Sequence, residues 1–133
     1  MVCNTAVFYD IENLVGLHNG KTNSNLHLDE IFRKVLELEN VNGISIQRAY
    51  ADWAAQAYRN LRCSVLEVGI EPIQVFTTNS YDKVKNAADV SMIIDAVDLI
   101  AKRPEIENYV IASGDGIFVF LSRNFPFYRE YIY

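Results

Sequence analysis

Apolar and polar positions recur with two different periods along the chain, and the period changes several times. Short apolar runs predict four strands, over residues 3–9, 44–51, 72–78 and 109–112. Apolar residues spaced three or four positions apart predict three helices, over residues 28–39, 53–68 and 88–102. Because each helix separates two strands, right-handed βαβ crossovers and a mostly parallel sheet are expected.

The predicted fold is a three-layer α/β/α sandwich whose mostly parallel sheet has the strand order 3-2-1-4. The strands are near-continuous apolar runs, which is typical of parallel strands covered on both faces. Residues 10–25 are predicted as a loop, and residues 117–122 as one or two turns of helix. The long helix is predicted to face the core with Val90, Ile93, Ile94, Val97 and Ile100/Ala101.

The C-terminal segment is unusually aromatic. Residues 123–133 contain five aromatic side chains, and then the sequence stops. Either residues 127–133 supply a fifth strand, or the C-terminus is shortened, since a sheet of this kind would usually add a strand and a closing helix. A sheet edge left unpaired there would favour a homodimer.

Composition limits the class of protein. A length of 133 residues fits a single domain spanning 1–133. We expect no membrane association, because the sequence has no apolar run of about 18 residues and no signal peptide. Cys3 and Cys63 lack metal-type spacing, which favours a reduced, cytoplasmic setting. The net charge of −5 argues against a broad nucleic-acid footprint held by phosphate contacts alone, but bound cations would reverse the local field in a nuclease.

Four aspartates are placed where they could meet. Asp10, Asp52 and Asp115 follow the first, second and fourth predicted strands, and Asp89 opens the long helix. In the order 3-2-1-4 the carboxyl ends of these strands line one crevice, which Asp89 can reach from the helix start. Carboxylate oxygens suit Mg²⁺ or Mn²⁺, which can activate water for attack on a phosphate. Each aspartate could instead be an ordinary loop starter or helix cap.

Three segments in this order resemble the motifs of a known family: Phe8-Tyr9-Asp10-Ile11-Glu12-Asn13-Leu14, Lys85-Asn86-Ala87-Ala88-Asp89-Val90 and Ser113-Gly114-Asp115-Gly116. They look like the NYN domain, the LabA-like branch of the PIN-like nuclease superfamily, from residue 4 to about residue 121. The resemblance implies a PIN-like sandwich and a Mg²⁺- or Mn²⁺-dependent ribonuclease acting on RNA, which we expect to be single-stranded. It places the metal site at Asp10, Asp89 and Asp115, with a lesser place for Asp52.

Other residues are supporting candidates. The resemblance implies that Asn13 orients the Asp10 loop or a metal-bound water. It also implies that Ser113 could hydrogen-bond to the groups that surround the metal. Family members often carry an acid at the position of Asp95, where a supporting or capping role is expected, because six residues turn it about 240° from Asp89 around the helix. Lys85 could steer a phosphate toward the metal, but an ordinary surface lysine is the favoured interpretation. Glu12 is a minor candidate, since it is expected to point away from Asp10.

Tyr50, Trp53 and Tyr58 could stack on nucleic-acid bases, but packing in the core is the favoured interpretation.

Two departures from the family pattern suggest another function. The family reads Ser-Gly-Asp-x-Asp-Phe, and Ile117 replaces its second acid. The family also continues with another strand and helix where this chain ends in its aromatic segment. The alternative is therefore a catalytically weakened module that binds RNA or protein in the regulation of gene expression. A flavodoxin-like receiver domain is disfavoured by the three motifs and by the lack of Thr/Ser and then Lys at the later strand ends.

Overall fold

The structure is a computed structural model, and it describes residues 2–15, 17–18, 21–22, 28–76, 87–114, 116–122 and 130–131. In chain order, the elements are β1 (Thr5–Asp10), α1 (Ile11–Val15), β2 (Leu17–His18), β3 (Lys21–Thr22), α2 (Leu28–Leu36), β4 (Ile44–Ala51), α3 (Leu61–Glu67), β5 (Glu71–Gln74), α4 (Ala87–Lys102), β6 (Asn108–Ser113), β7 (Gly116–Leu121) and β8 (Glu130–Tyr131).

The main sheet has the order β5-β4-β1-β6-β7-β8. The pairs β5–β4, β4–β1 and β1–β6 are parallel, whereas β6–β7 and β7–β8 are antiparallel. The predicted order 3-2-1-4 is therefore confirmed, with β1 at the centre. A small hairpin of β2 and β3 forms a second sheet.

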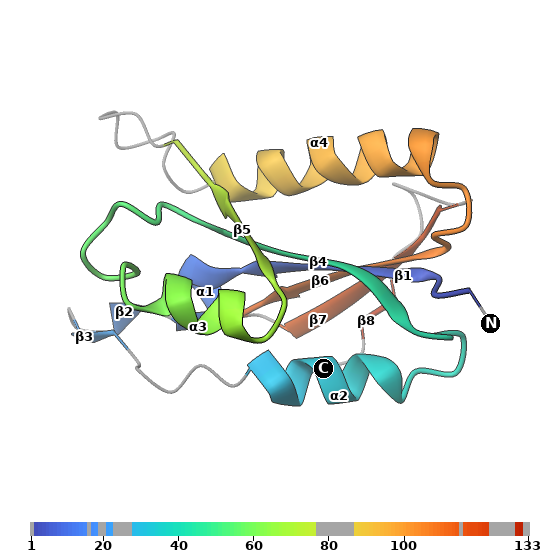
Figure 1. Cartoon of the computed structure of the whole chain (residues 1–133), viewed down its shortest axis with the longest axis horizontal. Helices are drawn as coiled ribbons and strands as arrows, with labels where there is room; N and C mark the ends of the chain where they lie inside the picture. The colour runs from blue at the N-terminus through green and yellow to red at the C-terminus, as the bar shows by residue number, and fades with distance from the viewer. Residues whose placement is uncertain are drawn as a thin grey trace.

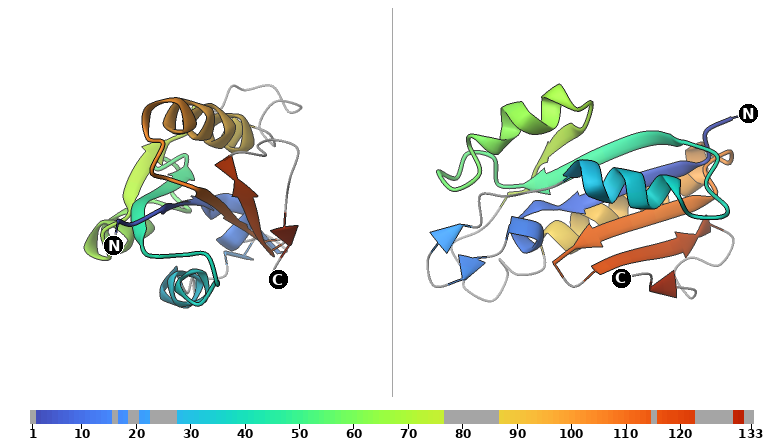
Figure 2. Two further views of the ribbon diagram at one scale, coloured as in Figure 1. Left: turned by 90° about the vertical axis from the view of Figure 1, so that its right-hand side faces the viewer. Right: turned by 90° about the horizontal axis from the view of Figure 1, so that it is seen from below.

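Helices cover both faces of the main sheet, as predicted. Figure 1 shows α4 above the sheet and α2 and α3 below it, and Figure 2 shows the same three layers end-on. Two apolar clusters fill the space between these layers. One contains Val7, Tyr9 and Val35 on the side of α2 and α3, and the other contains Phe8, Met92 and Leu99 on the side of α4.

The helix predicted over residues 117–122 is wrong, because this segment is strand β7. Ser113 and Gly116 are paired, so only two residues connect β6 to β7. Gly116 has a φ of 137°, a backbone conformation that is open to glycine at little energetic cost. Ile117 and Val119 are buried while Phe118 and Phe120 are half-buried, which is the two-residue period of a strand. An apolar run this short does not distinguish a strand from a helix by its period.

Three other predicted boundaries are also corrected. The loop predicted over residues 10–25 contains α1, β2 and β3. Residues 53–60 form turns, so α3 begins only at Leu61. The helix ends at Glu67, and Gly69, predicted to close it, follows just after with a φ of 81°. The predicted strand over 72–78 is described as β5 up to Gln74 only.

The face by which α4 packs on the sheet is opposite to the predicted one. Ala88, Met92, Ala96 and Leu99 are buried. Val90, Ile93, Ile94 and Val97 are exposed. Both faces of this helix are apolar, so the sequence pattern alone does not select one.

Among the helices that the structure describes, none combines the length and the apolar character that crossing a membrane would require.

Candidate functional site

The carboxyl ends of β1, β4 and β6 lie at one end of the sheet, and the first turn of α4 lies over the same end (Figure 1). The strand register explains this alignment, since Asp10 pairs with Tyr50 on β4, and Tyr9 pairs with Ala112 on β6. Chemistry in open α/β sheets is found at this end of parallel strands. Asp10 is the last residue of the central strand, and only 2% of its surface is exposed.

Asp10 is held by Asn13, three residues later in α1. The side-chain Nδ2 of Asn13 donates to one carboxylate oxygen of Asp10 at 2.5 Å, and the Asn13 backbone N–H donates to the other at 3.4 Å. The second bond is the contact of a helix N-cap. Asn13 therefore orients the Asp10 carboxylate, and Asp10 in turn caps α1.

Asp89, in the first turn of α4, is close enough to Asp10 for its charge to raise the pKa of that carboxyl. Ala6 and Phe8 pack on the α4 side of the sheet, so alternation along β1 directs Asp10 to that side as well. Burial raises the pKa of the Asp10 carboxyl, the hydrogen bonds from Asn13 oppose this rise, and the charge of Asp89 adds to it. Burial also raises the pKa of Asp89. The two carboxylates are thus partly desolvated and repel each other.

Glu12 belongs to the same group of acids, contrary to the expectation that it points away. Burial raises the pKa of Glu12, the charges of Asp10 and Asp52 raise it further, and a hydrogen bond from the backbone N–H of Asp52 lowers it. Glu12 therefore lies near both Asp10 and Asp52. Glu12 was not predicted at this site because residues 11–15 were expected to be a loop. These residues instead form α1, which turns Glu12 toward the end of β4.

Asp52 is placed beside Glu12 but is also engaged in the fold. Its Oδ1 accepts a hydrogen bond from Nε2 of Gln74 at 2.8 Å and one from the backbone N–H of Ala54 at 3.2 Å. These contacts fix the turn after β4 and connect it to the end of β5. One carboxylate oxygen of Asp52 thus stabilises the turn after β4. This is the ordinary loop-starting role given above as the alternative to metal binding.

Two aromatic residues near this site are core residues. Trp53 is buried, and its indole N–H donates to the carbonyl oxygen of Ile73 at 3.0 Å. Tyr58 is also buried, and burial together with the charges of Glu12 and Asp10 raises the pKa of its phenol. Tyr50 is fully buried in the α4 layer. Core packing is therefore confirmed for the three aromatics that were considered for base stacking.

Asp95 lies away from the acidic group and supports α4 on the sheet. Its carboxylate accepts a hydrogen bond from the hydroxyl of Tyr50 at 2.5 Å, and Nη1 of Arg48 lies 3.7 Å from it. These contacts connect the middle of α4 to β4. The expected supporting role of Asp95 thus corresponds to a structural contact with the sheet rather than to a contact with Asp89.

The tip of the β6–β7 hairpin packs on α1. A Cβ atom at Gly114 would lie 2.3 Å from the carbonyl oxygen of Asn13, so only glycine fits there without a shift of the backbone. Ser113, at the end of β6, is half-buried. Asp115 and Lys85 lie outside the described residues, so the structure does not place these two candidates.

The acidic site is defined here as Asp10, Glu12, Asp52 and Asp89. Its oxygen donors match the preference of a hard divalent cation in chemical type. None of the ion pairs between described residues involves these four side chains. No three of the His, Cys, Asp and Glu residues in the described segments are grouped closely enough to hold a metal ion. A complete cation site would therefore need a further ligand.

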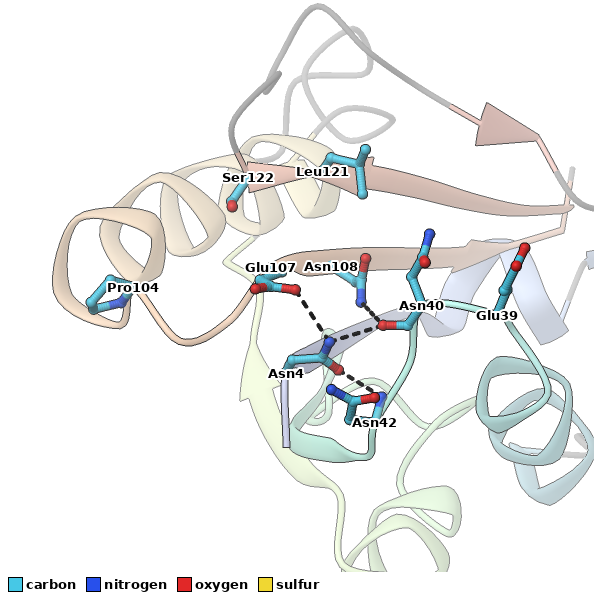
Figure 3. Close-up of a pocket in the computed structure, with 9 residues that line it drawn as sticks. All are labelled: Asn4, Glu39, Asn40, Asn42, Pro104, Glu107, Asn108, Leu121 and Ser122. Carbon is cyan, nitrogen blue, oxygen red and sulfur yellow. Dashed lines mark hydrogen bonds between the residues drawn. The ribbon is translucent and has the colours of Figure 1, made fainter. Parts of the chain in front are cut away.

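A cavity of about 570 Å³ opens at the opposite end of the sheet, where β1 and β6 begin (Figure 3). Asn4 and Asn108 are buried at this cavity, and both donate through Nδ2 to the carbonyl oxygen of Asn40, at 2.9 and 3.0 Å. These bonds hold the linker between α2 and β4 against the two strands. The polar groups of this cavity therefore serve the fold.

Comparison with known proteins places the chain in a family. A family model, the NYN domain, matches residues 4–126. No curated protein and no solved structure matches the chain significantly. The match covers most of the sequence and includes β1, α4 and β6, which position Asp10, Asp89 and Ser113. The chain therefore belongs to the NYN domain family, which is a family of PIN-like nucleases.

Proposed function

We propose that this protein is a metal-dependent ribonuclease that hydrolyses phosphodiester bonds in single-stranded RNA. The observation that supports this most directly is the buried carboxylate of Asp10 at the carboxyl end of the central strand, whose pKa is raised by burial and further by the charge of Asp89. Two partly desolvated carboxylates that repel each other gain from a cation between them. Membership of the NYN family provides independent support for RNA cleavage.

Each residue of the site has a role in this proposal. Asp10, Asp89 and Asp115 would hold Mg²⁺ or Mn²⁺, which would supply a Lewis acid and lower the pKa of a water molecule. Glu12 and Asp52 accept protons or hold water at the other side of the β1 end. Asn13 keeps Asp10 oriented, and Ser113 bonds to the same group of ligands. Asp95 positions α4 through Tyr50, and Lys85 steers the substrate phosphate.

The charge of the chain explains why a cation is needed for RNA to approach. The sequence carries 17 acidic and 12 basic residues. A phosphate entering the acidic site would be repelled unless a divalent ion neutralised the carboxylates. We place this reaction in the cytoplasm because Cys3 and Cys63 are both free thiols.

A second candidate function is an RNA-binding or protein-binding module with weakened catalysis, active in the regulation of gene expression. The observation that favours it is Ile117, which occupies the position of an acid in the family pattern. Ile117 is 4% exposed and packs in the cluster on the α2 and α3 side of the sheet. A carboxylate at this position would be buried in an apolar layer, so Ile117 suits the core, and the chain lacks the second acid of the family pattern.

The decisive experiment incubates the purified full chain with 5′-labelled single-stranded RNA and Mn²⁺. We expect cleavage that a chelator abolishes. Asp10→Asn and Asp89→Asn should each reduce the rate by about 100-fold or more, because each removes a charge that holds the cation. The matched control is Asp98→Asn on the same helix, since Asp98 is exposed and pairs only with Lys102 in the described structure.

Three results would decide against the nuclease. Intact RNA at high protein concentration would remove the catalytic proposal, and cleavage unchanged by Asp10→Asn would identify a contaminant. RNA binding without cleavage, together with no heat signal on titration with Mn²⁺, would support the weakened module instead.

A further inference from the structure

The outer face of α4 is apolar along most of the helix. Val90, Ile93, Ile94 and Val97 are 52, 49, 61 and 52% exposed, and these four residues are named the α4 stripe. Single exposed apolar residues are ordinary on protein surfaces, but four neighbours on one helix face form a contiguous patch. Such patches mark surfaces that another molecule covers.

The opposite face of α4 is apolar as well, because Ala88, Met92, Ala96 and Leu99 pack on the sheet. A helix that is apolar on both sides is typical of a position between two packed layers. In Figure 1 the sheet lies beneath α4, and among the described elements no layer lies above it.

We propose that the α4 stripe is the contact surface between two copies of this chain, which pack their α4 helices antiparallel about a two-fold axis. The four residues have the spacing i, i+3, i+4 and i+7, which is the spacing of a helix–helix seam. Their order, Val-x-x-Ile-Ile-x-x-Val, reads the same in both directions.

This symmetry is what a two-fold contact requires, since the same patch must complement itself. An axis that passes between Ile93 and Ile94 places Val90 of one copy opposite Val97 of the second copy. It also places Ile93 opposite Ile94. β-Branched side chains thus meet β-branched side chains at every level, and no charge is buried in the seam.

The helix dipoles of α4 favour the antiparallel arrangement, whereas its side-chain charges do not select an orientation. Asp89 lies in the first turn and Lys102 in the last. With the axis between Ile93 and Ile94, Asp89 of one copy lies level with Asp98 of the second copy, and Lys102 is paired with Asp98 of its own chain. The preference of the dipoles arises because the positive N-terminus of one helix then lies beside the negative C-terminus of the other.

The first test measures mass by light scattering after gel filtration of the full chain over a range of concentrations. We expect twice the chain mass of 15.2 kDa for the wild type and 15.2 kDa for Ile94→Glu, which places a charge in the seam. The matched control is Leu66→Glu on α3, where Leu66 is 55% exposed, and this variant should remain dimeric. A monomeric wild type at every concentration, or a dimeric Ile94→Glu that retains its circular dichroism spectrum, would overturn the proposal.

The second test measures the orientation of the helices by disulfide trapping in a Cys3→Ser, Cys63→Ser background. Ile94→Cys lies next to the axis and should cross-link two copies. Val90→Cys alone should not, because its two copies would be about 10 Å apart along the helix axes, beyond disulfide reach. Adding Val97→Cys should restore the cross-link. Efficient linking by Val90→Cys alone would show parallel packing and contradict the proposed geometry.

Discussion

At the scale of single residues, Asp10 has one contact that stabilises its charge and one that opposes it. The Asn13 side chain and backbone donate hydrogen bonds to the carboxylate, while burial and the charge of Asp89 act against ionisation. Capping α1 would need only the first contact. The repulsion with Asp89 has no benefit for the fold, and under the proposed function a bound cation would relieve it.

This balance predicts how the contribution of Asp10 to the free energy of unfolding changes with pH. Because the pKa of Asp10 is raised in the folded chain, its contribution to stability is complete below the ordinary carboxyl pKa and is lost as the pH rises through the folded pKa. In a chelator, Asp10→Asn should therefore be more stable than the wild type at pH 7, by on the order of 1 kcal/mol. The difference should disappear near pH 4.

Urea unfolding of both proteins between pH 4 and pH 7 checks this prediction. Carboxyl groups remote from Asp10 titrate equally in the two proteins, so the difference between the curves reports Asp10 together with its coupled neighbours Glu12 and Asp89. A wild type that becomes more stable relative to Asp10→Asn as the pH rises would contradict it.

Residue-level prediction from the sequence worked where the strand pattern itself sets the position. Asp10 and Asp52 follow strands that are confirmed, and both carboxylates lie at the expected end of the sheet. Glu12 could not be placed, because a single turn of helix is too short to leave a periodic signal. The role of Asp95 depends on Tyr50, a contact 45 residues away in the sequence that no local pattern contains.

At the scale of elements, α4 shows why an apolar pattern can be read on the wrong face. The larger β-branched side chains were expected in the core, but the sheet instead receives Ala88 and Ala96, with Met92 and Leu99 filling the remaining space. Small side chains let the helix axis approach the buried tyrosines of the sheet, Tyr50 and Tyr109. Volume complementarity between layers decided the face, and a single sequence does not encode it locally.

The two faces of α4 can be compared with the same substitution. Ala96 is 1% exposed, whereas Ala101 is on the exposed side of the helix. Ala96→Ile should destabilise the fold by about 1–3 kcal/mol, because it overpacks the contact with the sheet. Ala101→Ile should change the stability by less than about 0.5 kcal/mol. Thermal and urea unfolding measure both, and equal effects would argue against the packing of α4 described above.

At the scale of the whole molecule, the two ends of the sheet have different tasks. The end with Asp10 and Asp89 concentrates charge, while the end with Asn4 and Asn108 satisfies polar groups. Asn108 also donates to Oγ1 of Thr5, a residue 103 positions away. These asparagines connect the central strand, its neighbour β6 and the linker that follows α2.

Removing one of these asparagines should therefore destabilise the entire fold. Asn108→Ala loses the bonds to Thr5 and Asn40 in a buried setting and should reduce the free energy of unfolding by about 2–3 kcal/mol. Asn4→Ala should be non-additive with it, because both side chains donate to the same carbonyl oxygen. Asn42→Ala is the matched control, since only the backbone N–H of Asn42 bonds to Asn4. Urea unfolding of the single and double variants is the measurement, and additive effects would mean that the two asparagines act separately.

The order of the parallel strands was predictable because each strand and helix is long enough to show its own period. The antiparallel β7 was not, because its direction depends on a two-residue turn between Ser113 and Gly116 rather than on the apolar pattern.

The central position of β1 has a consequence for how the chain folds during synthesis. β1 is the first strand in the sequence, yet its two neighbours begin at Ile44 and Asn108. At a synthesis rate of about 5–20 residues per second, the 103 residues between Thr5 and Asn108 take roughly 5 to 20 s to appear. During this interval the largely apolar strand β1 can pair with β4 but not yet with β6. Such an interval favours chaperone binding and self-association over native pairing.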